Sequence, residues 1–502
     1  MSAAPLFGDA SGHPPEVEGR AVTVAGIGVS GVSAARALAR LGAAVTVVDG
    51  GDGPVQRERA ETLAAEGIGA RLGDGETLPP GTELVVTSPG WRPDGTLFAA
   101  AAAARPGGVP VWGDVELAWR LRALPGACDA PWLAVTGTNG KTTTVQMLAA
   151  VLDAAGLRTA AVGNIGTPIV DVVLSGEPYD VLAVELSSYQ LHWAPSVRAH
   201  SAAVLNLAPD HLDWHGSMAA YAADKGRVYS GNTVACVYNA ADPATEALVR
   251  EADVTEGCRA VGFTLGTPGP SELGVVDGLL VDRAFVPDRH RQAQELAELS
   301  DIAPSAGPPA PHNVANALAA AALARAFGVP PTAVRDGLRA FSPDAHRIAR
   351  VAEVDGVTYV NDSKATNTHA AQASLAAYQP VVWIAGGLAK GATFDELVGS
   401  AADRLRGVVL LGADRHLIAE ALARHAPDVP VVDLDRTDTG AMTEAVRAAA
   451  GLARSGDTVL LAPACASMDM FTHYGRRGEA FAEAVGLLGG AAGSVPPEDR
   501  EA

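Results

Sequence analysis

The stretch Trp132-Leu-Ala-Val-Thr-Gly-Thr-Asn-Gly-Lys-Thr-Thr-Thr144 constrains the fold more than any other part of the chain. An apolar strand runs directly into a loop with two glycines, and apolar residues then recur on one helical face. These residues are Val145, Leu148 and Leu152. A strand, glycine loop and helix in this order bring backbone N–H groups and the positive end of a helix together, which suits phosphate oxygens. Lys141 adds a positive charge and Thr142 a hydroxyl suited to Mg²⁺. The segment predicts a nucleotide-phosphate loop.

The loop departs in one place from the common pattern G-x-x-x-x-G-K-[ST]. Val135 stands where that pattern has its first glycine, and Gly137 follows two positions later. This disfavours a simple GTPase. A glycine-rich turn without a ligand is the alternative, but Gly-Lys-Thr-Thr at a helix start is rare by chance.

The chain alternates short apolar runs with Ala- and Leu-rich segments of helical period, which is typical of α/β domains. Its 502 residues exceed what one hydrophobic core serves, because domains average roughly 150 residues. We expect three: an N-terminal Rossmann-like domain (1–130), a central P-loop-type parallel sheet that binds ATP (131–343) and a C-terminal Rossmann-like domain (344–502). The strands that support this lie at 21–25, 45–48, 84–87, 132–135, 181–184, 202–205, 357–360, 381–385, 408–411 and 458–461.

Breaks in the pattern mark connections. A Pro- and Gly-bearing stretch, 124–131, separates the first two domains, and the Pro-rich run 302–311 predicts a surface loop. A helix is expected from Asn313 to Phe327, ended by Gly328.

A second glycine motif opens the chain. Ala25-Gly-Ile-Gly-Val-Ser-Gly31 follows a strand and begins a helix, and Asp49 ends the next strand about 20 residues later. Taken alone, this fingerprint indicates NAD. A nicotinamide oxidoreductase would leave the loop at Lys141 unexplained.

Charge and composition exclude several classes. The net charge of -20 includes no Lys/Arg-rich run, which argues against a nucleic-acid partner. The four cysteines form no CxxC pair, so buried reduced thiols are expected rather than disulfides or a zinc site. No stretch reaches the roughly 20 apolar residues that span a bilayer, and no leader pattern is present. We expect a cytoplasmic protein without membrane insertion.

Several motifs in a fixed order resemble those of the Mur ligases. The loop Thr136-Gly-Thr-Asn-Gly-Lys-Thr142 carries the resemblance first. The others are Asn164-Ile-Gly-Thr-Pro168, Glu185-Leu-Ser-Ser-Tyr-Gln190, Leu205-Asn-Leu-Ala-Pro-Asp-His-Leu-Asp213, His312-Asn-Val-Ala-Asn316 and Asp362-Ser-Lys-Ala-Thr-Asn367. The resemblance covers nearly the whole chain and implies an ATP-dependent amide-bond ligase of peptidoglycan precursor synthesis. It implies ATP and Mg²⁺ as cofactors and a monomer. Related superfamily ligases, such as a folylpolyglutamate synthetase or a sister Mur enzyme, are the nearest alternatives.

The resemblance assigns a catalytic and metal cluster to Lys141, Glu185, His211 and Lys225, with Thr142 as a further Mg²⁺ ligand. Glu185 follows a buried strand like a Walker B carboxylate. Lys225 occupies the position of the carbamylated lysine in the family, and a carbamate offers Mg²⁺ oxygen ligands that an ammonium does not. Asp210, Asp213 and His215 are expected to support the cluster. For Lys225, residue chemistry alone favours an exposed helix lysine.

The resemblance also implies three binding sets. ATP is assigned to Gly137, Thr138, Asn139, Gly140, Lys141, Thr142, Thr143, Asn313, Asn316, Arg347 and Asp362. The UDP-linked substrate is assigned to Val29, Ser30, Asp49, Gly90, Asn164, Ser187 and Gln190. The amino acid is assigned to Lys364, Thr366, Lys390, Ser467, Met468 and Tyr474. For Asn313 and Asn316, the alternative role is helix capping. For Lys390, the alternative is a solvated loop residue without a ligand.

The acceptor amino acid follows from one motif. Ligases for diaminopimelate or lysine carry an Asp-Asn-Pro-Arg-type signature, where this chain has Asp362-Ser-Lys-Ala-Thr-Asn367. The resemblance therefore implies D-glutamate as the acceptor and UDP-N-acetylmuramoyl-L-alanine as the other substrate. Gly50 and Gly51 stand after Asp49, where some relatives have a basic residue, so the uridine contacts stay open.

Overall fold

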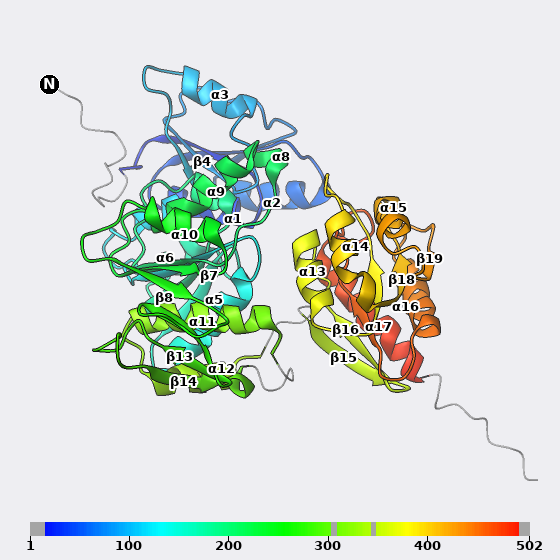
Figure 1. The fold of residues 1–502 in the computed structure, drawn as a ribbon. Coiled ribbons are helices and arrows are strands. Elements are labelled where there is room, and N and C mark those ends of the chain that lie inside the picture. The colour runs from blue at the N-terminus through cyan, green and yellow to red at the C-terminus, as the bar shows by residue number, and fades with distance from the viewer. Residues whose placement is uncertain (1–15, 303–308, 343–347, 491–502) are drawn as a thin grey trace, which may run out of the picture. The chain divides into compact units, whose positions relative to one another are not determined.

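The computed structural model describes residues 16–302, 309–342 and 348–490 (Figure 1). Three sheets with flanking helices make up this part of the chain, as the α/β prediction requires. The chain divides into two compact units. One holds the first two sheets, from the ranges Met1–Ile302 and Asn313–Phe341. The other holds the third sheet, from Ser342–Ala502 with Ala303–His312. The domain boundaries at 130 and 343 stay a prediction.

The first sheet is parallel, with the strand order β3-β2-β1-β4-β5. Its strands are β1 (Ala21–Ala25), β2 (Ala44–Asp49), β3 (Gly69–Leu72), β4 (Leu84–Thr87) and β5 (Val111–Gly113). Its helices are α1 (Val29–Arg40), α2 (Pro54–Ala65), α3 (Thr96–Ala103) and α4 (Asp114–Leu121). The strand order reverses between β1 and β4. Ligands of such sheets bind outside the carboxyl ends of the strands at this point.

The second sheet has nine strands in the order β14-β13-β12-β11-β10-β9-β6-β8-β7. Its strands are β6 (Trp132–Thr136), β7 (Thr159–Gly163), β8 (Val181–Glu185), β9 (Ser201–Val204), β10 (Ala235–Asn239), β11 (Arg259–Phe263), β12 (Glu272–Val276), β13 (Leu279–Asp282) and β14 (Gln294–Glu298). The prediction of a parallel central sheet is right for β6 to β12. It is wrong at the edge, where β13 pairs antiparallel with both β12 and β14.

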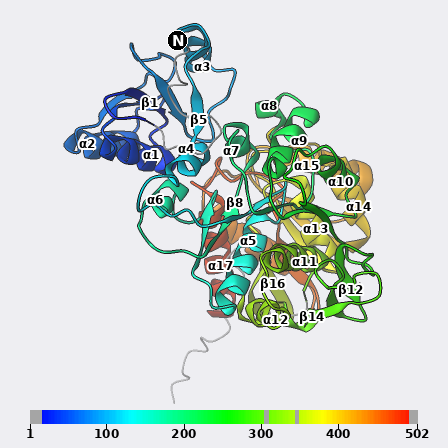
Figure 2. The same ribbon diagram turned by 90° about the vertical axis from the view of Figure 1, so that its left-hand side faces the viewer.

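Helices cover this sheet, and α5 begins at its carboxyl edge, directly after the loop that follows β6. They are α5 (Lys141–Ala154), α6 (Ile169–Val173), α7 (Ser188–His192), α8 (Leu212–His215), α9 (Met218–Gly226), α10 (Pro243–Arg250), α11 (Pro311–Ala326) and α12 (Pro331–Ala340), with short 3-10 turns at Arg227–Tyr229 and Leu299–Asp301. In Figure 2, α5 runs beside α11 and α12. A β carbon on Gly337 would lie 2.4 Å from Val151, so this glycine permits the close packing of α12 on α5.

The third sheet has the order β15-β16-β20-β17-β18-β19 and is parallel except for β15. Its strands are β15 (Ala349–Val354), β16 (Val357–Asn361), β17 (Val381–Ala385), β18 (Leu405–Leu410), β19 (Val431–Asp433) and β20 (Thr458–Leu461). Its helices are α13 (Thr368–Ala376), α14 (Asp395–Ala401), α15 (Arg415–His425), α16 (Ala441–Leu452) and α17 (Tyr474–Gly490), with a 3-10 turn at Ala402–Arg404.

Each face of the third sheet has its own hydrophobic core. Along β17, Trp383 packs on the side of α13, α14 and α15, whereas Ile384 packs on the side of α16 and α17. Alternate side chains of a strand point to opposite faces. The sheet is therefore doubly wound, as the Rossmann-like prediction states.

Some expectations need correction or lie beyond the described residues. The helix expected from Asn313 begins earlier, at Pro311. Most of the Pro-rich loop 302–311, and Arg347, lie outside the described residues. The cysteines are free thiols, but Cys258 is only partly buried and its Sγ lies 3.9 Å from that of Cys236. No helix in the described ranges has the length and apolar character to cross a membrane.

Candidate active site

The predicted phosphate loop connects β6 to α5 at the carboxyl edge of the central sheet. Gly137 has a φ of +150°, and Gly140, directly before α5, has a φ of +84°. A β carbon on Gly140 would lie 2.4 Å from the side-chain oxygen of Asn316 in α11. Glycine adopts this conformation without strain and leaves room for the asparagine.

Neighbouring segments hold the loop in place. The Thr138 N–H donates to the Asn206 carbonyl at 3.0 Å, and the Thr138 hydroxyl oxygen accepts from the Ala208 N–H at 3.0 Å. The Asn139 N–H donates to the Asn206 side chain, which donates back to the Asn139 carbonyl. These bonds fix the loop backbone without a ligand. Thr142 and Thr143 lie buried in the first turn of α5.

Two lysines converge on one carbonyl of this loop. The Lys141 ammonium donates to the Gly137 and Thr138 carbonyls, both at 2.9 Å, and the Lys225 ammonium donates to the Gly137 carbonyl at 2.8 Å. Lys225 is 2% exposed, so the alternative of an exposed helix lysine is wrong. Burial and then the charge of Lys141 hold the pKa of Lys225 well below its ordinary value, although Asp210 and Glu185 act in the opposite direction.

Glu185 is the last residue of β8 and is 2% exposed. One carboxylate oxygen accepts from the Asn164 side-chain amide at 2.9 Å. The other oxygen, Oε2, is buried without a hydrogen-bond partner. Buried carboxylate oxygens normally have partners, so Glu185 retains the capacity to bind a cation.

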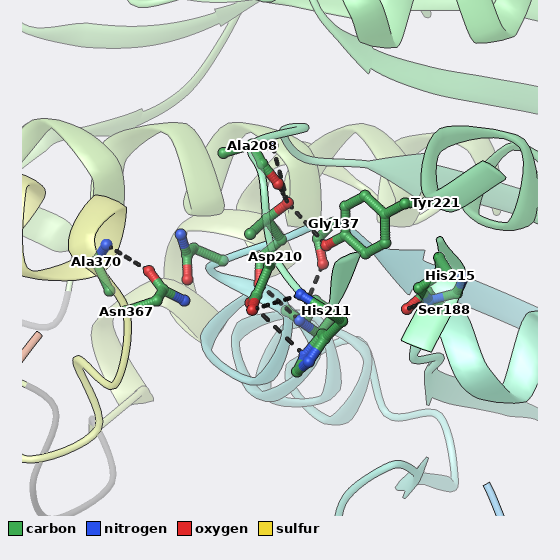
Figure 3. Close-up of polar contacts among 12 residues, drawn as sticks. Gly137, Ser188, Ala208, Asp210, His211, His215, Tyr221, Asn367 and Ala370 are labelled. Carbon is green, nitrogen blue, oxygen red and sulfur yellow. Dashed lines mark hydrogen bonds and ion pairs between the residues drawn. The ribbon is translucent and has the colours of Figure 1, made fainter. Parts of the chain in front are cut away.

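His211 precedes α8 in a left-handed conformation, with a φ of +54°. Its side chain is half-exposed, its ring lies 4.9 Å from that of Tyr189, and its Nε2 lies 3.6 Å from the Asp210 carboxylate. Figure 3 shows Asp210 and His211 beside the loop at Gly137. The structure thus gathers the loop, Lys225, Asp210 and His211 in one region.

The predicted supporting residues differ in their roles. Asp210 accepts from the His211 N–H at 2.9 Å, whereas His215 turns to Ser188 and Asp224. Burial raises the pKa of Asp224, but hydrogen bonds from His192 and His215 outweigh it and bring that pKa to about 2. Asp224 and His192 were not predicted, although Asp224 directly precedes Lys225 in the chain.

Asn313 and Asn316 lie one turn apart in α11, with their side chains 3.4 Å apart. The helix begins two residues before Asn313, so Asn313 is not its N-cap. Asn316 is buried against the phosphate loop. The structure therefore places Asn316 next to Gly140, and the ATP-binding role of the two asparagines stays a prediction.

In the first sheet, Asp49 is tied to the glycine loop. Its carboxylate accepts from the N–H groups of Ile27 and Gly51, both at 2.8 Å. A pocket of about 580 Å³ opens beside it, and Trp91 is among the residues that line it. Val29 is 62% exposed at the start of α1, and Gly90 is also exposed. Trp91 went unnoticed in the sequence, although it directly follows the singled-out Gly90.

The other residues assigned to the UDP substrate have protein partners. Ser187 and Gln190 form the capping box of α7, and the Gln190 amide donates to Asp114 at 3.4 Å. Burial raises the pKa of Asp114 to about 6, against weaker effects of hydrogen bonds from Gln190 and Ser30. Asp114 was not predicted as a site residue, but it accepts hydrogen bonds from Ser30 and Gln190, which were.

In the second unit, the residues assigned to the amino acid surround the ends of β16, β17 and β20. The Lys364 ammonium lies 5.2 Å from the ring centre of Tyr474, the first residue of α17. Lys390 is exposed, with a φ of +49°. Thr366 and the buried Ser467 lie in the loops after β16 and β20, and Met468 is exposed. The Asp362 carboxylate accepts from the Ser374 hydroxyl and from the Ile348 N–H.

Arg477 organises these loops and was not predicted. It is 2% exposed and donates to the carbonyl oxygens of Ser363 and Cys465 at 2.9 and 3.1 Å. Burial lowers the pKa of Arg477 to about 10, so it remains charged at neutral pH. Its signal, the second arginine of Tyr474-Gly-Arg-Arg477, cannot be distinguished from a surface helix residue.

Within 16–302, 309–342 and 348–490, no group of three or more His, Cys, Asp and Glu side chains is arranged to hold a metal ion. The predicted metal set contains only two such residues, Glu185 and His211. Its other members, Thr142 and Lys225, are of residue types that this finding does not cover, so the predicted metal site stays a prediction.

Comparisons with known proteins show the family of the chain. Residues 135–324 match the Mur ligase middle domain, and residues 346–465 match the family described as Mur ligase, glutamate ligase domain. A UDP-N-acetylmuramoylalanine--D-glutamate ligase of Streptomyces coelicolor is 75% identical over 476 residues, which cover 95% of this chain and 100% of that protein. The similarly named protein of Thermobifida fusca is 62% identical over 480 residues, 95% of this chain and 100% of its own length.

Solved structures share the fold at low identity. MurF ligase from Thermotoga maritima, in complex with ADP, has a TM-score of 0.56 at 16% identity, covering 88% of this chain and 95% of its own. UDP-N-acetylmuramate-alanine ligase MurC from Thermotoga maritima has a TM-score of 0.55 at 18% identity, covering 93% and 99%.

A strand–glycine loop–helix phosphate site, followed by a second α/β unit, defines a nucleotide-dependent multidomain enzyme. The chain belongs to the Mur ligase family, whose enzymes form amide bonds at the expense of ATP.

Proposed function

We propose that the protein joins D-glutamate to UDP-N-acetylmuramoyl-L-alanine, with hydrolysis of ATP to ADP and phosphate, in cytoplasmic peptidoglycan precursor synthesis. Full-length relatives that bear this enzyme's name support the substrate assignment. The observation that carries the chemistry is the convergence of Lys141 and Lys225 on the Gly137 carbonyl. The charge of Lys141 attracts an anionic phosphoryl group, and burial together with that charge favours loss of the proton of Lys225.

The reaction has two steps. The L-alanyl carboxylate attacks the γ-phosphorus of ATP, and ADP leaves, which gives an acyl phosphate. The D-glutamate amine then attacks the acyl carbon, loses a proton, and phosphate leaves with the former carboxylate oxygen. Lys141 and the N–H groups at the start of α5 stabilise charge on the transferred group, so catalysis rests on positioning and electrostatics.

Magnesium fits the residues of this site. The buried Glu185 oxygen without a partner is a hard anionic ligand, and Thr142 adds a hydroxyl. We assign Mg²⁺ to these two with His211 and a carbamylated Lys225. The ion would neutralise charge on the phosphate oxygens. The low pKa of Lys225 favours the neutral amine that reacts with CO₂.

The substrates take separate sets of residues. ATP is assigned to the loop Gly137–Thr143, with Asn313, Asn316 and Asp362, and Arg347 stays a prediction. The UDP group is assigned to Val29, Ser30, Asp49, Gly90, Asn164, Ser187 and Gln190, and D-glutamate to Lys364, Thr366, Lys390, Ser467, Met468 and Tyr474. Because one chain supplies all these residues, we expect a monomer.

Phosphate release tests the proposal. Purified protein is mixed with ATP, Mg²⁺ and UDP-N-acetylmuramoyl-L-alanine, and D-glutamate, L-lysine or meso-diaminopimelate is added in turn. We expect release with D-glutamate alone. Equal release with L-lysine or diaminopimelate would remove the acceptor assignment and leave the ligase assignment intact.

A further inference from the structure

His215 joins two other helices of the site through its two ring nitrogens. Its Nε2 lies 3.0 Å from the Ser188 hydroxyl in α7, and its Nδ1 lies 2.9 Å from the Asp224 carboxylate in α9. Figure 3 shows Ser188 beside His215. The His215 side chain is 0% exposed, and Ser188 and Asp224 are buried. Buried polar groups depend on such bonds, because water does not replace them.

The network extends beyond these three residues. Asp224 also accepts from His192 Nδ1 at 2.9 Å, and an Arg227 nitrogen lies 3.3 Å from its other oxygen. An ionised carboxylate only accepts, so both Nδ1 atoms carry the protons. His215 Nε2 is then the acceptor for the Ser188 hydroxyl. Each polar atom of this hydrogen-bond network therefore acts either as a donor or as an acceptor, without conflict.

The order Ser188, His215, Asp224 is that of a serine hydrolase triad. A nucleophilic hydroxyl must meet its substrate, yet Ser188 is 3% exposed. The network therefore serves another purpose, which its neighbours in the chain indicate.

Each end of the network borders a residue of the proposed phosphoryl-transfer site. Asp224 directly precedes Lys225 in α9, and Ser188 begins α7 three residues after Glu185. From its other contacts, α9 reaches the phosphate loop: the Tyr221 hydroxyl lies 3.0 Å from that of Thr138, and Lys225 donates to Gly137. The helix is thus held at the loop by one set of contacts and at α7 by the other.

We propose that Ser188, His215 and Asp224 are positioning residues that fix Lys225 relative to Glu185. The inference rests on the proposed function, because it concerns the phosphoryl-transfer step. Partners that orient the groups of such a site are typically worth about 10- to 100-fold in activity.

Three variants test the proposal. Ser188→Ala removes one hydroxyl, and Asp224→Asn removes the charge with little change in shape. Ser217→Ala is the matched control: its hydroxyl accepts from the Ala220 N–H as the cap of α9, so the substitution weakens the same helix through a bond that involves no residue of the network. For each protein, kcat, the KM values of D-glutamate and UDP-N-acetylmuramoyl-L-alanine, and the melting temperature are measured.

We expect Ser188→Ala and Asp224→Asn to lower kcat about 10- to 100-fold with both KM values unchanged. Ser217→Ala should lower only the melting temperature. If Ser188→Ala retains the wild-type kcat, or if the losses of kcat follow the melting temperature in all three variants, the positioning role is overturned. Wild-type turnover with D-glutamate is the separate check on the proposed function.

Discussion

At the Gly137 carbonyl, two ammonium groups share one oxygen, and one of them is fully buried. Lys141 lies at the start of α5, where a bound phosphoryl group would reduce the repulsion between the Lys141 and Lys225 ammonium groups. For Lys225 the repulsion is removed in another way, because loss of its proton removes the charge and leaves an amine that can react with CO₂. The two lysines therefore have different chemical roles despite their common contact.

Replacement of Lys225 by alanine tests the carbamate. We expect Lys225→Ala to lose activity because the oxygen ligands of the carbamate disappear, and short carboxylic acids to restore part of it by filling the vacated space. Phosphate release is measured with acetate, propionate or bicarbonate added. Bicarbonate should give no rescue, since no amine remains. Full activity of Lys225→Ala without any addition would contradict the role.

The buried Asp114 predicts a pH dependence of stability. Its folded-state pKa is raised to about 6, so the folded protein holds this proton over a range where the unfolded chain has lost it. The penalty is absent below the unfolded pKa, grows as pH rises from there to the folded pKa of about 6, and above that pH stays on the order of 3 kcal/mol. Asp114→Asn should therefore stabilise the protein at pH 8 more than at pH 5. Thermal unfolding measures this, and an equal effect at both pH values would contradict it.

At the scale of elements, the sequence predicts what local chemistry determines. The strand–loop–helix at Trp132 was correct because glycines, a lysine and the apolar pattern all lie within one segment. The hairpin of β12 and β13 was missed, although Asp277-Gly278 between two apolar runs is a turn signal. The strand β14 was missed because Glu295 and Glu298 make it polar. The relay from His192 to Ser188 was also missed, because it depends on three helices that meet only in the fold.

The loop glycines give a prediction at this scale. Gly140→Ala strains a left-handed residue and drives its β carbon against Asn316. We expect kcat/KM for ATP to fall about 100-fold, as for other small displacements at a reacting group. Gly156→Ala, at the other end of α5, is the control: its φ is +77° and nothing lies within 4 Å. It should cost about 1–2 kcal/mol of stability and no activity. An equal loss of kcat/KM in both variants would show that backbone strain alone causes it, and would contradict a specific role for the space beside Asn316.

At the scale of the whole molecule, the two proposed steps use different units. The phosphate loop, Glu185, His211 and Lys225 belong to the first unit, and the residues assigned to D-glutamate belong to the second. The relatives from Streptomyces coelicolor and Streptomyces avermitilis align with 95% and 94% of the chain, which is consistent with a function that requires both units.

This division predicts a selective effect of Lys390→Ala. Loss of one charge-assisted hydrogen bond to a carboxylate costs roughly 1.5 to 3 kcal/mol, so the KM for D-glutamate should rise about 10- to 150-fold. The KM values for ATP and the UDP substrate should stay the same. Arg436→Ala removes an exposed charge of the same unit, where Arg436 pairs with Asp438, and serves as the control. An unchanged KM for D-glutamate would mean that Lys390 is a solvated loop residue that does not bind the amino acid.

Oxygen transfer tests the central claim most directly. UDP-N-acetylmuramoyl-L-alanine labelled with ¹⁸O in both oxygens of its L-alanyl carboxylate is converted with ATP, Mg²⁺ and D-glutamate, and the products are weighed by mass spectrometry. An acyl phosphate places one labelled oxygen in the released phosphate and keeps the other in the new amide. Phosphate without label, formed together with the D-glutamate product, would contradict the account.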